Sequence, residues 1–157
     1  MIVVSDTSPL RRLHPIGRLT VLRDLYGRIL VPPTVASELR AAPHLHECLD
    51  WSLLEVLAPR SPERVQSLLK ELDRGESEAI VLALEQQADL LPIDERTGRD
   101  VASRLEIRRT GLLGVLLEAK REGLISSVTS EIDRLVGVTT FRIDPLVRVE
   151  VLHLAGE

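Results

Sequence analysis

Four carboxylates of this chain have positions from which they could together take part in chemistry on a phosphate group. Each follows a short apolar run or a helix-start signal, and they are Asp6, Glu38, Glu78 and Asp94. In an open α/β sheet, the carboxyl ends of neighbouring strands border one crevice. Acids that meet in such a crevice repel one another, and a divalent cation relieves that repulsion. The pattern therefore predicts a metal site built from carboxylates.

The ligand type indicates which metal and which reaction. Mg²⁺ and Mn²⁺ prefer oxygen ligands, and the four acids supply oxygen without histidine or cysteine. One or two such ions can activate a water molecule and offset the charge of a phosphodiester under attack. Thr7 and Ser8 follow Asp6 directly, and their hydroxyl groups could orient the water or the phosphate by hydrogen bonding.

Several of these residues have a competing structural role. Asp6 could cap the helix that follows it, and Glu38 could lie on a solvated helix face. Glu76 and Glu78 point in different directions on a helix because they are two residues apart. Asp73 and Glu76 have the spacing of a capping box, so we prefer Glu78 as the third acid and assign Glu76 a supporting role.

The fourth acid has neighbours that compete for its role. Asp94 comes directly after a strand, while Glu95 could be an auxiliary ligand or a surface residue. Arg99 could bind phosphate or pair with an acid, and Thr110 could cap a helix or line the site. Pro92 lies in the strand that leads to Asp94, and it predicts a bulge or pairing on one side only, because proline has no N–H to donate.

The apolar pattern predicts alternating strands and helices. Short β-branched or apolar runs predict strands at residues 2–4, 29–31, 88–93 and 107–110. Helical spacing and helix-start signals predict helices within 10–25, from 33 onward, and over 62–72, 78–87, 99–105 and 112–122, with one more run through 136. Residues 51–57 fit either a strand or a helix. Such alternation is typical of βαβ units, and hence of a parallel sheet with helices on both faces.

Length and composition favour one globular domain of 157 residues, with a core over about 1–125 and a helical tail over 126–157. Only three residues are aromatic, which argues against a base-stacking platform for single strands. The net charge of −4 argues weakly against a nucleic-acid partner. If four of the 24 acids bind a metal, however, the other 20 balance the 20 lysines and arginines, and local basic clusters can still attract a polyanion.

The single cysteine, Cys48, excludes an intrachain disulfide and fits a reducing compartment. His44, His46 and Cys48 have no second ligand cluster of matching spacing, so a zinc site is not predicted. No apolar run approaches the ~20 residues of a membrane span, and the first residues do not form a signal peptide. We therefore expect a cytoplasmic protein with no membrane partner.

Four segments, in this order and spacing, resemble the PIN domain family. They are the strand ending in Asp6-Thr7-Ser8, residues 31–39 around Glu38, residues 72–80 around Glu78, and residues 91–99 around Asp94. Residues 110–120 are similar to one prokaryotic PIN-like branch, the DUF3368-like proteins, which are related to the toxins of VapBC-type toxin–antitoxin systems. The resemblance covers about residues 1–125.

The resemblance implies a three-layer α/β/α fold with a central parallel sheet, and a ribonuclease that hydrolyses RNA phosphodiesters with Mg²⁺ or Mn²⁺. By position, Asp6, Glu38, Glu78 and Asp94 match the four acids of the family in order. It also implies an RNA substrate, a cognate antitoxin protein that holds a toxin inactive, and a homodimer. The leucine-rich helices over 65–72 and 112–117 could pack in such a dimer or in the core.

A non-catalytic PIN-like module that binds RNA or protein is the main alternative. The presence of all four acids favours the enzyme. A phosphatase of the haloacid dehalogenase kind needs a second acid two residues after the first, where this chain has Ser8. A receiver domain needs paired acids after the first strand, and Ser5 with Asp6 does not supply them.

Overall fold

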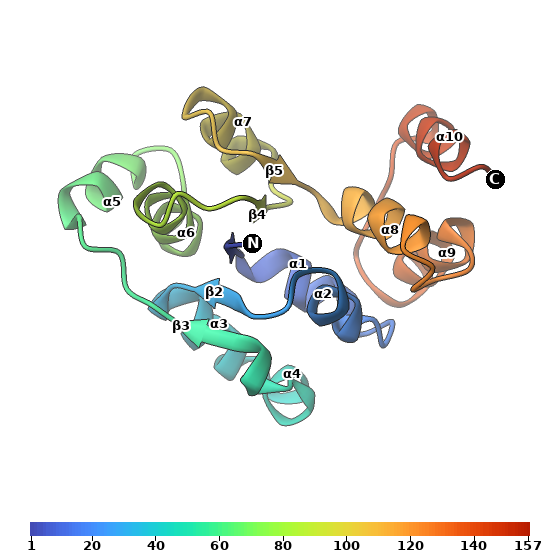
Figure 1. Cartoon of the computed structure of the whole chain (residues 1–157), viewed down its shortest axis with the longest axis horizontal. Coiled ribbons are helices and arrows are strands. Elements are labelled where there is room, and N and C mark those ends of the chain that lie inside the picture. The colour runs from blue at the N-terminus through green and yellow to red at the C-terminus, as the bar shows by residue number, and fades with distance from the viewer.

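Five short strands, all parallel, form the middle layer of the computed structural model, which describes residues 1–157 (Figure 1). Three of them, β1 (Val3–Val4), β2 (Ile29–Val31) and β3 (Leu54–Val56), pair in the order β1-β2-β3. The other two, β4 (Leu91–Pro92) and β5 (Arg109–Thr110), pair with each other. A single bridge between Val3 and Leu90 joins the two sheets. The predicted parallel sheet is confirmed.

Pro92 explains why β1 and β4 pair over so few residues. On the β5 side, the N–H groups of Leu91 and Ile93 donate to the carbonyls of Arg108 and Thr110, both at 2.9 Å. On the β1 side, Pro92 has no N–H to give, and only its carbonyl is used, by the Asp6 N–H at 3.3 Å. Its pairing on that side is therefore incomplete, as expected for proline in a strand.

The third strand of the larger sheet lies in the segment whose sequence fitted either a strand or a helix. Residues Trp51–Leu53 form one 3₁₀ turn, which Asp50 caps by accepting a hydrogen bond from the Ser52 N–H at 3.0 Å. The chain then extends as β3, which pairs with β2 from Leu54 to Val56. Both readings were thus partly right, because a turn and a strand share these seven residues.

Successive strand residues point to opposite faces of the sheet, as the period of two requires. Val3 belongs to the larger hydrophobic core and Val4 to the smaller one, and Leu90 and Leu91 divide in the same way. The larger core also contains residues of α1 (Thr7–Leu13), α2 (Leu19–Tyr26), α3 (Pro33–Ala41), α4 (Pro43–Cys48), α8 (Leu112–Arg121), α9 (Val128–Val138) and α10 (Pro145–Leu154). Against the smaller core pack α5 (Pro62–Leu68), α6 (Arg74–Glu85) and α7 (Arg96–Arg104). The three-layer α/β/α fold is confirmed.

Local signals in the sequence set several helix ends. Pro15 and Gly17, the latter with φ of +68°, separate α1 from α2. Asp73 and Glu76 form both hydrogen bonds of a capping box at the start of α6. Gly123, with φ of +74°, lies just past the end of α8 and permits a left-handed turn.

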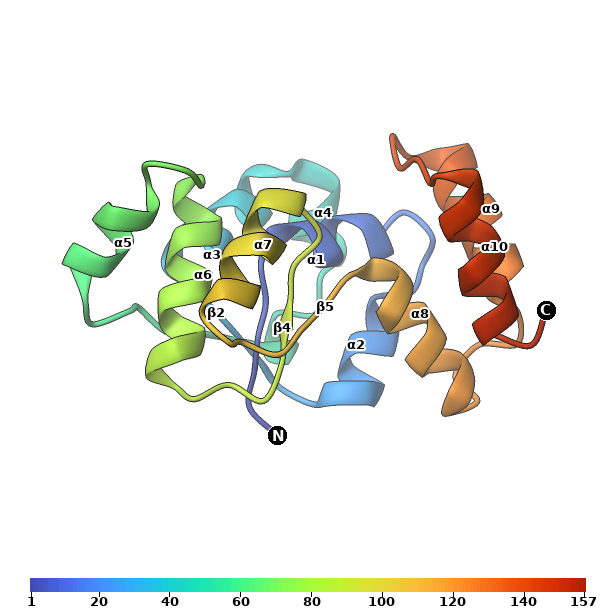
Figure 2. The ribbon, with the colours of Figure 1, turned by 90° about the horizontal axis from the view of Figure 1, so that it is seen from above.

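The last two helices lie together at the end of the molecule opposite α5 (Figure 2). An ion pair holds α9 against the start of the chain: Arg18, between α1 and α2, donates two hydrogen bonds to the buried Glu131 of α9, at 2.9 and 2.5 Å. The apolar residues Leu112, Val115 and Leu116 of α8 are buried in the larger core and are not free for a dimer. None of the helices combines the length and hydropathy that a membrane span requires.

Candidate metal site

Asp6 lies two residues past the end of β1, at the carboxyl edge of the sheet. It occupies the N-cap position of α1, but its side chain makes no capping hydrogen bond. Only 4% of the residue is exposed. A buried carboxylate that no other side chain engages, with only the Thr7 and Ser8 N–H groups nearby, is available for another ligand.

Glu38 reaches the same region from α3. One of its carboxylate oxygens accepts a hydrogen bond from the hydroxyl group of Thr7, the neighbour of Asp6. The other lies against the backbone of Gly75, where an added Cβ would come within 3.1 Å of it. Glycine at the start of α6 therefore allows this carboxylate to approach the N-terminus of the helix, which favours negative charge.

Glu76 supplies the third acid of the cluster. It lies in the first turn of α6 and is 6% exposed. Its Oε2 accepts the 3.3 Å capping-box bond from the Asp73 N–H, and its Oε1 is buried without a hydrogen-bond partner. A Cβ on Gly98 of α7 would lie 3.1 Å from that oxygen, so α7 covers it closely. Buried polar atoms without a partner are rare in folded proteins and call for an explanation such as an ion.

The electrostatics show that Asp6 and Glu76 belong to one cluster. Burial raises the pKa of Asp6 from 3.8 to about 6, and the charges of Asp73 and Glu38 add to the rise, while the N–H groups of Thr7 and Ser8 offset part of it. The pKa of Glu76 rises from 4.5 to about 7, first through burial, then through the charge of Asp73, and further through Asp6 and Glu95. Asp73 thus acts on both acids, and Asp6 acts on Glu76.

Glu78, the acid preferred from the sequence, does not face this cluster. Its Oε2 accepts a hydrogen bond from the Thr34 N–H at 3.1 Å, and its Oε1 pairs with Arg74 at 3.5 Å. Thr34 is in the first turn of α3, so Glu78 satisfies a free N–H group at the start of that helix. The structure places Glu78 between α6 and α3, and places Glu76 beside Asp6, because the two residues differ by about 200° around the helix.

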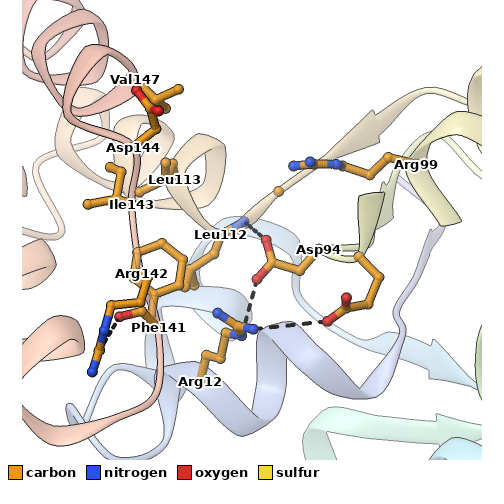
Figure 3. A pocket seen from close by; sticks show the side chains of 12 residues that line it. Arg12, Asp94, Arg99, Leu112, Leu113, Phe141, Arg142, Ile143, Asp144 and Val147 are labelled. Carbon is orange, nitrogen blue, oxygen red and sulfur yellow. Dashed lines mark hydrogen bonds and ion pairs between the residues drawn. The ribbon is translucent and has the colours of Figure 1, made fainter. Parts of the chain in front are cut away.

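Asp94 is at the carboxyl edge, as predicted, but both of its oxygens are engaged. Oδ1 accepts a hydrogen bond from the Leu112 N–H, at the start of α8, at 3.1 Å. Oδ2 pairs with the Arg12 Nε at 3.3 Å (Figure 3). This carboxylate therefore anchors two helices in the present arrangement.

Some of the predicted auxiliary residues act on the acids of the cluster, and others do not. Thr7 is bonded to Glu38, and the Ser8 N–H lies near the Asp6 carboxylate. Glu95 is exposed but still acts on Glu76 through its charge. The guanidinium group of Arg99 makes no ion pair, and Thr110 does not cap α8, where Gly111 is the N-cap residue. The prediction that Thr110 caps the helix is wrong because β5 extends through it.

Three residues that act on the acids of the site were not identified from the sequence. The charge of Asp73 acts on both Asp6 and Glu76, although the sequence indicated only its capping role. Arg12 engages Asp94 from α1, and Gly98 admits the close contact with Glu76. Asp73 could have been found from its spacing to Glu76, whereas pairing between residues 12 and 94 has no signal in a single sequence.

The donor set fits a hard divalent cation, although the side chains as they stand do not close on one point. No group of three or more carboxylate, histidine or cysteine side chains is arranged to hold an ion. Asp6 and the free oxygen of Glu76 are the unengaged donors, and Glu38 lies beside them. Mg²⁺ binds through one or two carboxylates and keeps several waters, so this set is sufficient.

Comparison with known proteins agrees with the fold. A sequence model of the family DUF3368, described as a PIN domain, matches residues 2–157. The chain belongs to the PIN-domain family, whose members are generally nucleases that use divalent metals. The match includes the last two helices. None of the curated proteins matches the chain.

Proposed function

We propose that this protein is a ribonuclease that hydrolyses RNA phosphodiesters with Mg²⁺ or Mn²⁺, acting in the cytoplasm. The observation that carries the proposal is the unpartnered Oε1 of Glu76, buried beside the equally buried Asp6. Burial and neighbouring carboxylates raise the pKa of both acids, so keeping both ionised is costly, and a divalent cation removes that cost. Such an ion, when bound, supplies an activated water and offsets phosphate charge.

The residues of the chain have distinct roles in this proposal. Asp6 and Glu76 hold the ion, and Glu38 completes the set from α3 with its orientation fixed by Thr7. Asp94 keeps the start of α8 and the guanidinium of Arg12 at the border of the site. Gly98 and α7 exclude water from the Glu76 side.

The test is cleavage of a total-RNA pool by the purified protein in the presence of Mg²⁺, Mn²⁺ or EDTA. Wild-type protein is expected to cleave with either metal and to lose that activity in EDTA, and Asp6→Asn is expected to be inactive with both metals. Calorimetry with Mn²⁺ should show binding to wild type and a large loss of affinity in Asp6→Asn. Cleavage that persists in EDTA would contradict a metal-dependent mechanism.

A non-catalytic module that binds RNA or protein is the second candidate. The engagement of Asp94 by Arg12 and Leu112, and of Glu38 by Thr7, favours it, because these contacts occupy carboxylate oxygens of the cluster. Absence of both cleavage and Mn²⁺ binding, with RNA binding retained, would establish the module instead of the enzyme.

We also propose that a cognate antitoxin covers this site, as the toxin relationship implies. The pairing of Arg12 with Asp94 supports it, since a guanidinium group fits the edge of the acidic cluster. Expression of the chain alone should arrest growth, and co-expression with the neighbouring reading frame should relieve the arrest and yield a complex. Co-expression that gives neither would contradict the proposal.

A further inference from the structure

Two adjoining clefts open beside the candidate metal site, between α1, α7 and the segment that joins α9 to α10. Figure 3 shows the first of them. Their volumes are about 270 and 410 Å³, and both are lined by Arg12, Glu95 and Phe141. Ligand pockets usually measure ~300–1,000 Å³, so the pair has the size for a nucleotide-scale group. Ser8 and Glu95 connect the clefts to the surroundings of Asp6 and Glu76.

Arg99 brings an uncompensated positive charge to the first cleft. It lies in α7, it is half-buried, and its guanidinium group makes no ion pair and donates no hydrogen bond. An added Cβ on Gly111 would lie 3.6 Å from the Arg99 Nη1 and 3.3 Å from the Asp94 Oδ1, so this glycine keeps the space between them open. A partly desolvated cation without a partner is costly, and an incoming anion would relieve that cost.

Arg12 brings a second guanidinium group from α1. It approaches the Asp94 Oδ2 through Nε at 3.3 Å, and its Nη2 lies 4.0 Å from a carboxylate oxygen of Glu95. The ring of Phe141 supports it from the other side, with the guanidinium carbon 5.2 Å from the ring centre. Arginine has five N–H donors, so this arrangement leaves several free for a second anion.

The remaining charged residues of the first cleft are already occupied. Asp144 caps α10 through the Leu146 N–H at 2.8 Å. Arg142 is bonded to backbone carbonyls, the closest that of Phe141 at 2.7 Å, so its orientation is fixed although its charge remains. Asp94 has Arg12, and Glu95 is mostly exposed to water that screens its charge. The unpaired charge in the cleft is therefore positive, and a negatively charged group would neutralise it.

We propose that Arg12 and Arg99 form a phosphate-binding subsite, which receives the RNA backbone next to the phosphate that is cut at Asp6 and Glu76. This inference rests on the ribonuclease function proposed above. The ligand is the sugar–phosphate backbone of single-stranded RNA, because Phe141 is the only aromatic residue of the clefts and is nearly buried under Arg12. Binding through phosphate alone tolerates many sequences.

The subsite is tested by binding in the absence of cleavage. A fluorescent single-stranded RNA oligonucleotide is titrated with the protein in EDTA, and fluorescence anisotropy is recorded at several salt concentrations. Arg99→Ala is expected to weaken binding at least about fivefold and to lower the slope of log K against log salt by about 0.7, the value for one phosphate contact on a single strand. Arg12→Ala should act similarly, and Arg12→Lys should restore part of the loss.

Arg28→Ala is the matched control, since it removes the same charge at an exposed position that precedes β2, at the opposite end of the strand from the site. It should leave affinity and slope unchanged. If Arg12→Ala unfolds, Arg99→Ala decides alone, because Arg99 has no partner to lose. Equal affinity and slope in Arg99→Ala and wild type, or a wild type that binds no RNA at low salt, would overturn the subsite.

The outcomes separate this inference from the function on which it rests. Wild type that cleaves RNA with Mn²⁺, while Arg99→Ala binds and cleaves normally, removes the subsite and leaves the nuclease. Wild type that binds RNA through Arg99 but never cleaves supports the subsite and removes the nuclease. If both hold, Arg99→Ala should raise KM with little change in kcat, because a remote contact binds substrate and transition state alike.

Discussion

Glu76 and Glu78 lie within one turn of α6 but differ in how their carboxylates are engaged. Both are buried, but Glu78 has two partners for its carboxylate whereas one oxygen of Glu76 has none. Glu76→Gln is therefore expected to lower metal-dependent cleavage by about 100-fold or more, the scale of losing a ligand to a catalytic metal. Glu78→Gln should retain most of the activity. Initial rates of RNA cleavage with Mn²⁺ measure both.

The two substitutions should change the stability of the protein in opposite directions. Glu78→Gln weakens the bonds to Thr34 and Arg74 and should lower the melting temperature. Glu76→Gln removes a buried charge, one oxygen of which has no partner, and should raise the melting temperature in EDTA. If Glu78→Gln folds but is inactive while Glu76→Gln is active, then Glu78 and not Glu76 is the metal ligand.

The raised pKa values of Asp6 and Glu76 predict how the metal-free protein responds to pH. A carboxyl group whose pKa is higher in the folded state stabilises the fold while it is protonated, and that contribution is lost as pH rises from about 4 toward its folded pKa. Those folded pKa values are about 6 and about 7. In EDTA, the melting temperature is therefore expected to fall between pH 5 and pH 8.

Mn²⁺ should reverse this dependence, because the ion binds the ionised acids. The increase in melting temperature on adding Mn²⁺ should be several degrees at pH 8 and much smaller at pH 5. Asp6→Asn should flatten both curves. If the melting temperature in EDTA is the same at pH 5 and pH 8, the pKa values of these acids are not raised in the folded protein.

At the scale of elements, the sequence predicted what depends on local periodicity and capping. The apolar runs located four of the five strands, and the spacing of Asp73 and Glu76 located the start of α6. The sequence is less informative where the outcome depends on distant residues. Which of Glu76 and Glu78 faces Asp6 depends on how α6 packs against α3 and α7, and a capping residue can also face a site, so local spacing does not decide between them.

The same limit explains why the site was only partly predicted. The edge position of Asp6 and Asp94 follows from their place directly after strands of a parallel sheet, and the apolar runs locate those strands. The pairing of Arg12 with Asp94, and the cover that Gly98 gives to Glu76, join segments far apart in the chain. Contacts of that kind are set by tertiary packing, and one sequence carries no pattern for them.

The contact between α7 and the acids gives a prediction about Gly98. A Cβ there would lie 2.6 Å from the Cδ1 of Ile93 and 3.1 Å from the Oε1 of Glu76, too close for the packed arrangement. Gly98→Ala is expected to destabilise the fold by about 1–3 kcal/mol, as overpacking does, and to reduce Mn²⁺ affinity by displacing Glu76. Denaturant unfolding and calorimetry measure the two effects.

Gly137→Ala is the control for this substitution. Gly137 lies inside α9, and an added Cβ would meet nothing within 4 Å. Alanine has the better helix propensity, so the variant should gain about 0.5–1 kcal/mol and leave Mn²⁺ affinity unchanged. If Gly98→Ala behaved like this control, α7 would not press on the acidic cluster.

At the scale of the whole molecule, the charge is divided between an acidic cluster and a neighbouring positive cleft. The net charge of −4 hides this arrangement, because Arg12 and Arg99 stand beside the cluster that contains Asp6 and Glu76. A polyanion is attracted by the local field and not by the total charge. Composition alone therefore argues only weakly against a nucleic-acid partner, and RNA binding stays a proposal that rests on the local charge.

The other feature at this scale is the apolar surface of the last two helices. Leu146 and Val149 of α10 are 81% and 68% exposed, and Val138 of α9 and Leu154 of α10 are also exposed. Single exposed apolar residues are ordinary, but several on one helix at one end of the molecule indicate an interaction surface. We propose that two copies of the chain pair through α10, with the same face contributed by each copy.

The mass in solution tests this pairing. Light scattering over a wide concentration range should give twice the 17.5 kDa of one chain for wild type, and 17.5 kDa for Val149→Glu, which places a charge within the apolar face. Leu105→Glu changes an exposed apolar residue at the end of α7 and should stay dimeric, because that residue lies outside the α10 face. A wild type that remains a monomer at high concentration would leave the α10 face to another partner. A dimer that survives Val149→Glu would place the interface elsewhere, and the buried Leu112, Val115 and Leu116 of α8 could not supply it, because the core already covers them.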